Sequence, residues 1–199
     1  MRIRRIIFLS SLCCIVVFVV IFSWRNRREH YFDKEILNAA KRYGVEPTLI
    51  KAVVWRETRF DPSARGRAQE IGLMQIRESA ALDWASAEKI YPFEHEQVLD
   101  AGTNTLVGAW YLKKLLRRYA QTDNPIPYAL ADYNAGRGNV LKWISGAGAT
   151  NSEAFIQQIG FPMTSNYVRS VMKKLEHYRA EFPKQIKEKQ GSTCFRWSE

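Results

Sequence analysis

Apolar residues recur three and four positions apart along most of this chain, the spacing that places side chains on one face of a helix. The first such stripe ends at Gly44, a residue type that commonly terminates helices, and Pro47 suits the first turn of the next helix. The members of this stripe are Ile36, Leu37, Ala40 and Tyr43. No segment of useful length shows the alternation of a strand, so we expect a mainly α domain.

The rest of the chain continues this pattern, interrupted by polar, proline-containing or glycine-containing stretches. We expect a loop over 61–70, helices over about 72–84 and 100–120, and a helix that Pro125 opens and that Gly136 and Gly138 break. Shorter helices are predicted over 140–144 and 154–159, with a small-residue loop over 146–152 between them. A last helix carries apolar positions between 167 and 178, and a charged tail follows Phe182.

The N-terminal region differs from the remainder because residues 6–24 carry no charge and are mostly apolar. A run of this length can cross a bilayer as a helix, and no small-residue cleavage site follows it. We therefore expect an uncleaved, single transmembrane helix within residues 1–28, a folded domain over 29–183 and a charged, flexible tail over 184–199. Basic residues are nearly balanced across the span, so the positive-inside rule does not decide its orientation.

Charge and cysteine usage exclude several classes of function. Six arginines beside the apolar run account for much of the net charge of +10, so the excess on the domain is too small to indicate nucleic-acid binding. Two of the three cysteines lie within the run and the third, Cys194, lies in the tail, so the domain has no internal disulfide. Three scattered histidines do not indicate a metal site, and we expect neither a metal nor another cofactor.

A carboxylate interrupts the apolar stripe of the helix that Pro47 opens. Ile50, Val53 and Val54 share one face, and the next position of that face is Glu57. A carboxyl group on such a face either pairs with a cation, for example Arg56, or raises its pKa and keeps its proton. The first outcome is structural and the second provides a general acid.

Five short motifs together resemble the soluble lytic transglycosylase (SLT) domain of bacterial lytic transglycosylases, which are relatives of goose-type lysozyme. The resemblance lies in their order and spacing and covers roughly residues 33–182. The motifs are Glu57-Thr58-Arg59-Phe60-Asp61-Pro62-Ser63-Ala64, Gly72-Leu73-Met74-Gln75, Asn104 with Gly108 and Tyr111-Leu112, Tyr133-Asn134-Ala135-Gly136, and Tyr167-Val168.

This resemblance implies a lysozyme-like fold that cleaves the β-1,4 bond between N-acetylmuramic acid and N-acetylglucosamine in peptidoglycan. It also implies that Glu57 first protonates the glycosidic oxygen and then acts as a base, while the muramoyl 6-hydroxyl attacks the anomeric carbon and leaves a 1,6-anhydro end. Ordinary glycosidases need two carboxylates. Because an internal hydroxyl replaces the attacking water, one carboxylate can suffice here.

The resemblance further implies five substrate-binding residues, each of which has a structural alternative. Met74 and Tyr167 lie at positions where core packing is the default, and Tyr133-Asn134-Ala135-Gly136 also suits a helix end. The implied substrate-binding residues are Gln75, Met74, Tyr133, Asn134 and Tyr167.

The chain departs from the family pattern at several positions. Thr58 replaces a serine and keeps its hydroxyl, Gly66 stands where the family has a serine that would bond the catalytic carboxyl, and Met163 replaces a glutamate that helps to build the cleft. Gln69 and Glu70 replace a Gly-Ala pair. Glu70 is therefore a possible second carboxylate that could activate water, or else a solvated charge near a helix N-terminus.

The main hypothesis is a lytic transglycosylase anchored in the bacterial inner (cytoplasmic) membrane, with its domain facing the periplasm or cell wall. Its expected partners are peptidoglycan glycan strands and, through the anchor, the membrane; the sequence does not identify any protein partner. One alternative is a muramidase that uses Glu70. Another is a weakly active peptidoglycan-binding scaffold protein, which the changes at Gly66 and Met163 favour.

Overall fold

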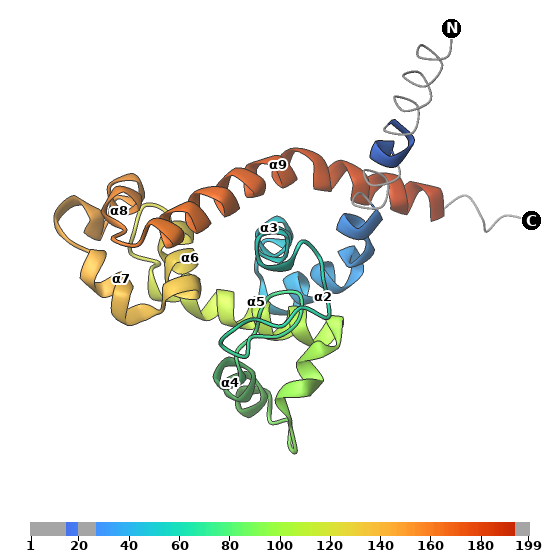
Figure 1. The fold of residues 1–199 in the computed structure, drawn as a ribbon, viewed down its shortest axis with the longest axis horizontal. Helices are drawn as coiled ribbons and strands as arrows, with labels where there is room; N and C mark the ends of the chain where they lie inside the picture. The colour runs from blue at the N-terminus through green and yellow to red at the C-terminus, as the bar shows by residue number, and fades with distance from the viewer. Residues whose placement is uncertain (1–14, 20–26, 194–199) are drawn as a thin grey trace, which may run out of the picture.

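The computed structural model describes residues 15–19 and 27–193, with side chains described as far as Phe182. Figure 1 shows an assembly of helices joined by short loops. Strand structure in these residues is limited to the isolated bridges Arg65–Ile71 and Ile71–Ile76, so the predicted mainly α class is confirmed. The elements are α2 (Asp33–Tyr43), α3 (Pro47–Thr58), α4 (Glu78–Glu88), η1 (His95–Leu99), α5 (Ala101–Arg118), α6 (Pro125–Ala135), α7 (Arg137–Trp143), η2 (Gly146–Ala149), α8 (Ser152–Gln158) and α9 (Pro162–Thr193).

Helix boundaries follow the local chemistry that the sequence suggests. Gly44 ends α2 in the left-handed conformation, with φ of 63°, and Pro47 occupies the first turn of α3. The Asp100 side chain accepts a hydrogen bond from the Thr103 amide and caps α5. These predicted starts and ends are therefore confirmed.

Helix α3 is the centre of the fold. It contacts α2, α5 and α9, and Figure 1 shows it beneath the long α9 and seen nearly end-on. Every side chain from Leu49 to Val54 is buried, not only the predicted face. Lys51 is among them. Its ammonium lies 2.6 Å from the Asp33 carboxylate of α2, and this ion pair offsets the cost of burying the charge. The surrounding helices thus hold α3 rigidly up to its last turn.

The prediction of a helix over 72–84 is wrong at its start. Residues 71–76 form a tight turn, and α4 begins only at Glu78 and continues to Glu88. Gly72 and Gln75 have φ of 74° and 50°, values that interrupt a right-handed helix. The buried Asn104 side chain stabilises this turn: it accepts from the Met74 amide at 2.8 Å and donates to the Ile71 carbonyl at 3.0 Å.

The structure also differs from two smaller predictions. Gly136 alone separates α6 from α7, and Gly138 lies within the first turn of α7 instead of breaking a helix. The backbone of α9 remains helical to Thr193, past Phe182, where the sequence predicts that the polar tail begins.

Most of the predicted anchor lies outside the described residues, which omit 1–14 and 20–26. Residues 15–19 are helical, and all five side chains are apolar and exposed. In the segments 15–19 and 27–193, no helix combines the length and apolar character needed to cross a membrane. The anchor and the boundaries 1–28, 29–183 and 184–199 therefore stay predictions.

Candidate active site

Glu57 lies in the last turn of α3, where the rigid helix meets a cavity. Burial raises the pKa of this carboxyl from an ordinary value of 4.5 to about 7, against the lowering effects of Tyr167 and Arg56. Within the described residues, no lysine or arginine forms an ion pair with it: Arg56 bonds Ser170, and Arg59 lies over the Trp55 ring. Of the two outcomes open to the Glu57 carboxyl, the structure therefore favours a group that keeps its proton over one that pairs with a cation.

Tyr167 of α9 holds the Glu57 carboxyl in place. Its hydroxyl donates to Glu57 Oε1 at 2.6 Å, and the tyrosine itself is almost fully buried. Burial and the nearby Glu57 raise the pKa of this phenol well above its usual value, so it remains a donor. Its ring also lies 5.2 Å from the Arg56 guanidinium. Tyr167 fixes one carboxyl oxygen and leaves the other, Oε2, for the cavity.

The cavity has a volume of about 370 Å³ and brings together residues from distant parts of the chain. Of the predicted site residues, Glu57, Glu70, Gln75, Tyr133 and Asn134 line it. Its other lining residues are Ile76, Arg77, Ser79, Ala80, Tyr111, Asp132, Ala135 and Gly136.

Met74 does not line this cavity through its side chain. The side chain is fully buried against Gly108, where any added Cβ would lie 2.2 Å from the Met74 sulfur. The close approach of α5 to the 71–76 turn therefore depends on glycine at position 108. Only the Met74 backbone is near the site, because its carbonyl accepts from the Tyr133 hydroxyl at 2.7 Å.

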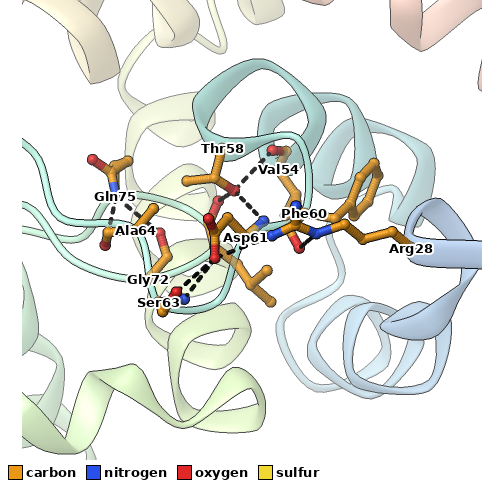
Figure 2. Close-up of polar contacts among 10 residues, drawn as sticks. Arg28, Val54, Thr58, Phe60, Asp61, Ser63, Ala64, Gly72 and Gln75 are labelled. Carbon is orange, nitrogen blue, oxygen red and sulfur yellow. Dashed lines mark hydrogen bonds and ion pairs between the residues drawn. The ribbon is translucent and has the colours of Figure 1, made fainter. Parts of the chain in front are cut away.

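Gln75 is held at the cavity by the backbone around it. Figure 2 shows its amide nitrogen donating to the carbonyls of Ala64, at 3.2 Å, and Gly72, at 3.0 Å. Its oxygen accepts no hydrogen bond from the described residues, which leaves an acceptor at the cavity wall. The left-handed backbone at Gln75 is therefore supported by its own side chain.

Tyr133 and Asn134 end α6 beside the cavity. Tyr133 uses its hydroxyl to bind the 71–76 turn, and its ring lies 5.6 Å from that of Tyr111. Asn134 accepts a hydrogen bond from Thr164 at 2.8 Å, which leaves its amide nitrogen as a donor. Thr164 follows Met163, whose side chain is 83% exposed. Met163, which departs from the family pattern, is thus directed to solvent, while its neighbour Thr164 holds Asn134 in place.

Glu70 shares the cavity with Glu57 but has a different environment. Its carboxylate accepts from the Ala68 amide at 2.9 Å and from the Arg77 guanidinium at 3.0 Å. Partial burial alone would raise its pKa, but these backbone and arginine bonds lower it below the usual range. Glu70 is therefore ionised at neutral pH, and its charge helps to raise the pKa of Glu57.

The departures at Gly66 and Glu70 are linked in space. A Cβ atom at position 66 would lie 2.3 Å from Glu70 Oε2 and 2.8 Å from Gln75 Oε1. The Glu70 carboxylate thus fills the space that a side chain at position 66 would need.

The cavity residues to which the sequence assigned no role include Arg77, Tyr111 and Asp132. Tyr111 belongs to a recognised motif and Asp132 precedes Tyr133, so both signals were present without an assigned role. Asp132 is buried and accepts from the Tyr119 hydroxyl at 2.7 Å and from Arg118.

Within the part of the chain that the structure describes, no group of three His, Cys, Asp or Glu side chains could hold a metal ion.

Comparisons with known proteins agree on one family. Residues 34–156 match the model of the "Transglycosylase SLT domain". The chain is similar to the membrane-bound lytic murein transglycosylase C of Pectobacterium atrosepticum, at 36% identity over 132 residues, which is 60% of this chain and 35% of that protein. It is also similar to the soluble lytic murein transglycosylase of Escherichia coli, at 32% identity over 137 residues, which is 68% of this chain and 21% of that protein.

Solved structures show the same fold. An inactive variant of the lytic transglycosylase Slt from Pseudomonas aeruginosa has a TM-score of 0.69 at 25% identity, covering 75% of this chain and 24% of that one. A complex of the 70-kDa soluble lytic transglycosylase with bulgecin A has a TM-score of 0.68 at 25% identity, covering 77% and 25%. The predicted lysozyme-like SLT fold is therefore confirmed, although the chain spans only about a third or less of its relatives' lengths. With the family model covering more than half of its residues, this chain belongs to the transglycosylase SLT domain family.

Proposed function

We propose that this chain is a peptidoglycan lytic transglycosylase that cleaves the N-acetylmuramic acid-β-1,4-N-acetylglucosamine bond and leaves 1,6-anhydro ends. The observation that carries the proposal is the Glu57 carboxyl, which faces the cavity with a pKa of about 7 and a hydrogen bond from Tyr167. A carboxylic acid that remains protonated near neutral pH suits general acid catalysis. Membership of the SLT family supports the substrate class.

In the first step, Glu57 donates its proton to the glycosidic oxygen. Tyr167 already donates to Oε1, so the proton is carried on Oε2, the oxygen left for the substrate. As the bond between the anomeric carbon and the glycosidic oxygen breaks, Glu57 becomes a carboxylate, and the Tyr167 hydrogen bond stabilises that charge.

In the second step, the same carboxylate accepts the proton of the muramoyl 6-hydroxyl, whose oxygen bonds to the anomeric carbon. The proton count balances, because Glu57 ends the cycle protonated and no water is consumed. Gln75 offers an acceptor and Asn134 a donor at the cavity wall. These groups suit the hydroxyl and acetamido groups of the sugar rings, and the chemistry calls for no cofactor.

A muramidase is the second candidate, and the position of Glu70 favours it. Glu70 is ionised in the same cavity as the protonated Glu57, and two carboxyl groups with different pKa values can divide the roles of acid and base. If Glu70 activates a water molecule, the product has a reducing end instead of an anhydro end. The ion pair with Arg77 opposes this role, because it lowers the pKa of Glu70 and so makes the carboxylate a weaker base for activating water.

The location that we propose is the inner membrane, with the catalytic domain in the periplasm or at the cell wall. The exposed apolar helix at 15–19 and the uncharged run over 6–24 support a membrane anchor. A substrate outside the cytoplasm would place the domain on the outer side of that membrane.

The test is digestion of purified peptidoglycan by the full chain in detergent, with products identified by mass spectrometry. Glu57→Gln is the inactive control and Glu70→Gln the diagnostic variant. Anhydromuramoyl ends that require Glu57 and persist in Glu70→Gln support the transglycosylase. Reducing ends that disappear in Glu70→Gln support the muramidase, and no product from a folded wild-type chain would leave only a peptidoglycan-binding scaffold.

A further inference from the structure

The turn that follows Glu57 has an unusual backbone. Helix α3 ends at Thr58, and the next two residues, Arg59 and Phe60, both have positive φ, at 54° and 65°. Non-glycine residues rarely adopt this conformation, and a bulky residue such as Phe60 does so only where the surroundings hold it there. Two successive residues of this kind, directly after the proposed acid, indicate that the turn must be stabilised from outside.

Arg28 provides contacts to this turn from a distant part of the sequence. Its Nε donates to the Phe60 carbonyl at 2.9 Å, and its Nη2 lies 3.1 Å from Asp61 Oδ1. Figure 2 shows Arg28 reaching the turn from a separate helix. A single guanidinium therefore binds the carbonyl of the second strained residue and the carboxylate that follows it.

The contacts continue from the turn to the cavity wall. Thr58 donates to the Leu73 carbonyl at 2.9 Å, and the Asp61 amide donates to the Thr58 hydroxyl at 3.2 Å. Leu73 belongs to the 71–76 turn that carries Gln75. Arg28 is thus the first member of a series of bonds that links the end of α3 to the turn that carries Gln75 (Figure 2).

The segment that carries Arg28 is itself fixed to the domain. Glu29 accepts from the Tyr178 hydroxyl at 2.5 Å and lies 3.1 Å from the Lys174 ammonium, both on α9. Asp33, at the start of α2, pairs with the buried Lys51 of α3. Glu29 and Asp33 thus bind the segment around Arg28 to α9 and α3, which fixes the position of Arg28 relative to the 59–61 turn.

We propose that Arg28 is a positioning residue for the reaction: it holds the 59–61 turn and so keeps the Glu57 carboxyl aligned with Tyr167 and the cavity. This inference rests on the proposed function. It also gives the end of the predicted anchor segment, 1–28, a part in positioning the catalytic group, although Arg28 lies outside the cavity and touches no substrate.

The experiment compares Arg28→Gln with Arg27→Gln in the full chain, in detergent, on soluble glycan chains. Arg27 is the matched control because it is adjacent, carries the same charge and, within the described residues, forms no hydrogen bond or ion pair. We expect Arg28→Gln to lower kcat about tenfold with an apparent KM within about twofold, since misplacement of a catalytic group affects the chemical step. The Arg27→Gln variant should match the wild type.

The pH profile separates positioning from a merely structural role. A Glu57 carboxyl released from its aligned, partly buried position should become more hydrated and have a lower pKa, so the alkaline limb of the kcat profile should move to lower pH in Arg28→Gln. Arg28→Lys keeps the charge but cannot bind both acceptors with one planar group, so it should show a smaller change in the same direction. If Arg28→Gln does not fold, Arg28→Lys decides alone.

The possible results distinguish failure of the proposed function from failure of the positioning role of Arg28. If the wild-type chain releases no anhydromuramoyl product, the proposed function fails before this inference is reached. If the wild type is active and every folded Arg28 variant retains its kcat and its pH profile, the positioning role is refuted. An equal loss in Arg27→Gln would assign the effect to charge near the membrane and would also refute it.

Discussion

Replacing Glu57 by Gln should stabilise the folded chain at alkaline pH while removing its activity. The partly buried Glu57 carboxyl keeps its proton up to a pKa of about 7, whereas in the unfolded chain it ionises near its ordinary value of 4.5. Between these values the folded state binds one more proton than the unfolded state, so the free energy of unfolding falls as the pH rises. Glutamine has nearly the same shape and carries no such penalty.

The two pKa values set the size of the effect. One pKa unit corresponds to about 1.4 kcal/mol, so the difference between 4.5 and about 7 amounts to roughly 3 kcal/mol once the pH exceeds both values. Below both values the carboxyl is neutral in either state and the penalty is absent. For a domain of this size, about 3 kcal/mol shifts the melting temperature by about 6–12 °C.

The assay is thermal unfolding followed by circular dichroism at 222 nm, near pH 4 and near pH 8, for the wild type and Glu57→Gln. The melting temperature of the variant should exceed that of the wild type by about 6–12 °C near pH 8 and by little near pH 4. Glu96→Gln is the control, because the Glu96 carboxylate is exposed and paired with Arg65, so its removal should give no such pH-dependent gain. A Glu57→Gln difference that is equal at both pH values would refute the reasoning.

Three further predictions follow from the same contacts. Tyr167→Phe removes a hydrogen bond that lowers the pKa of Glu57, so the alkaline limb of the activity profile should move to higher pH while kcat falls about tenfold; an unmoved limb would contradict this. Asn104→Ala leaves the bonded groups of the 71–76 turn unpaired and should destabilise the protein by about 3 kcal/mol, seen as a lower melting temperature, and an unchanged value would count against that role. Gly66→Ala should lower the melting temperature because its Cβ meets the Glu70 carboxylate, and adding Glu70→Ala should recover most of the loss; additive effects in this double-mutant cycle would show that the two positions are independent.

The helices were the most predictable part of the fold. Gly44, Pro47 and Asp100 act through local backbone chemistry, so the ends that they specify could be recognised from neighbouring residues alone. The 71–76 turn could not be recognised in this way. Its left-handed residues are held by Asn104, which lies far along the chain, and an apolar local sequence resembled a helix start.

The candidate site likewise contains residues that could be recognised from the sequence and contacts that only the packing of distant segments creates. The apolar helical face made Glu57 a candidate, but its role as the acid, like the roles of Gln75, Tyr133 and Asn134, came from the order of the family motifs. The placement of Met74 in the core and the bond from Tyr167 to Glu57 depend on how α5 and α9 pack against the rest of the fold. The roles inferred for Glu70 and Arg28 likewise rest on contacts between separate segments.

The sequence by itself thus determined the mainly α class, most helix boundaries, the family resemblance and Glu57 as the candidate acid, because periodicity, capping and motif order are properties of neighbouring or regularly spaced residues. Only the tertiary structure decided whether Glu57 meets a cation or a cavity, since the surroundings that set its pKa come from α9 and from the loop that carries Glu70. Burial and charge around a group depend on which distant segments pack against it, and local sequence does not contain that information.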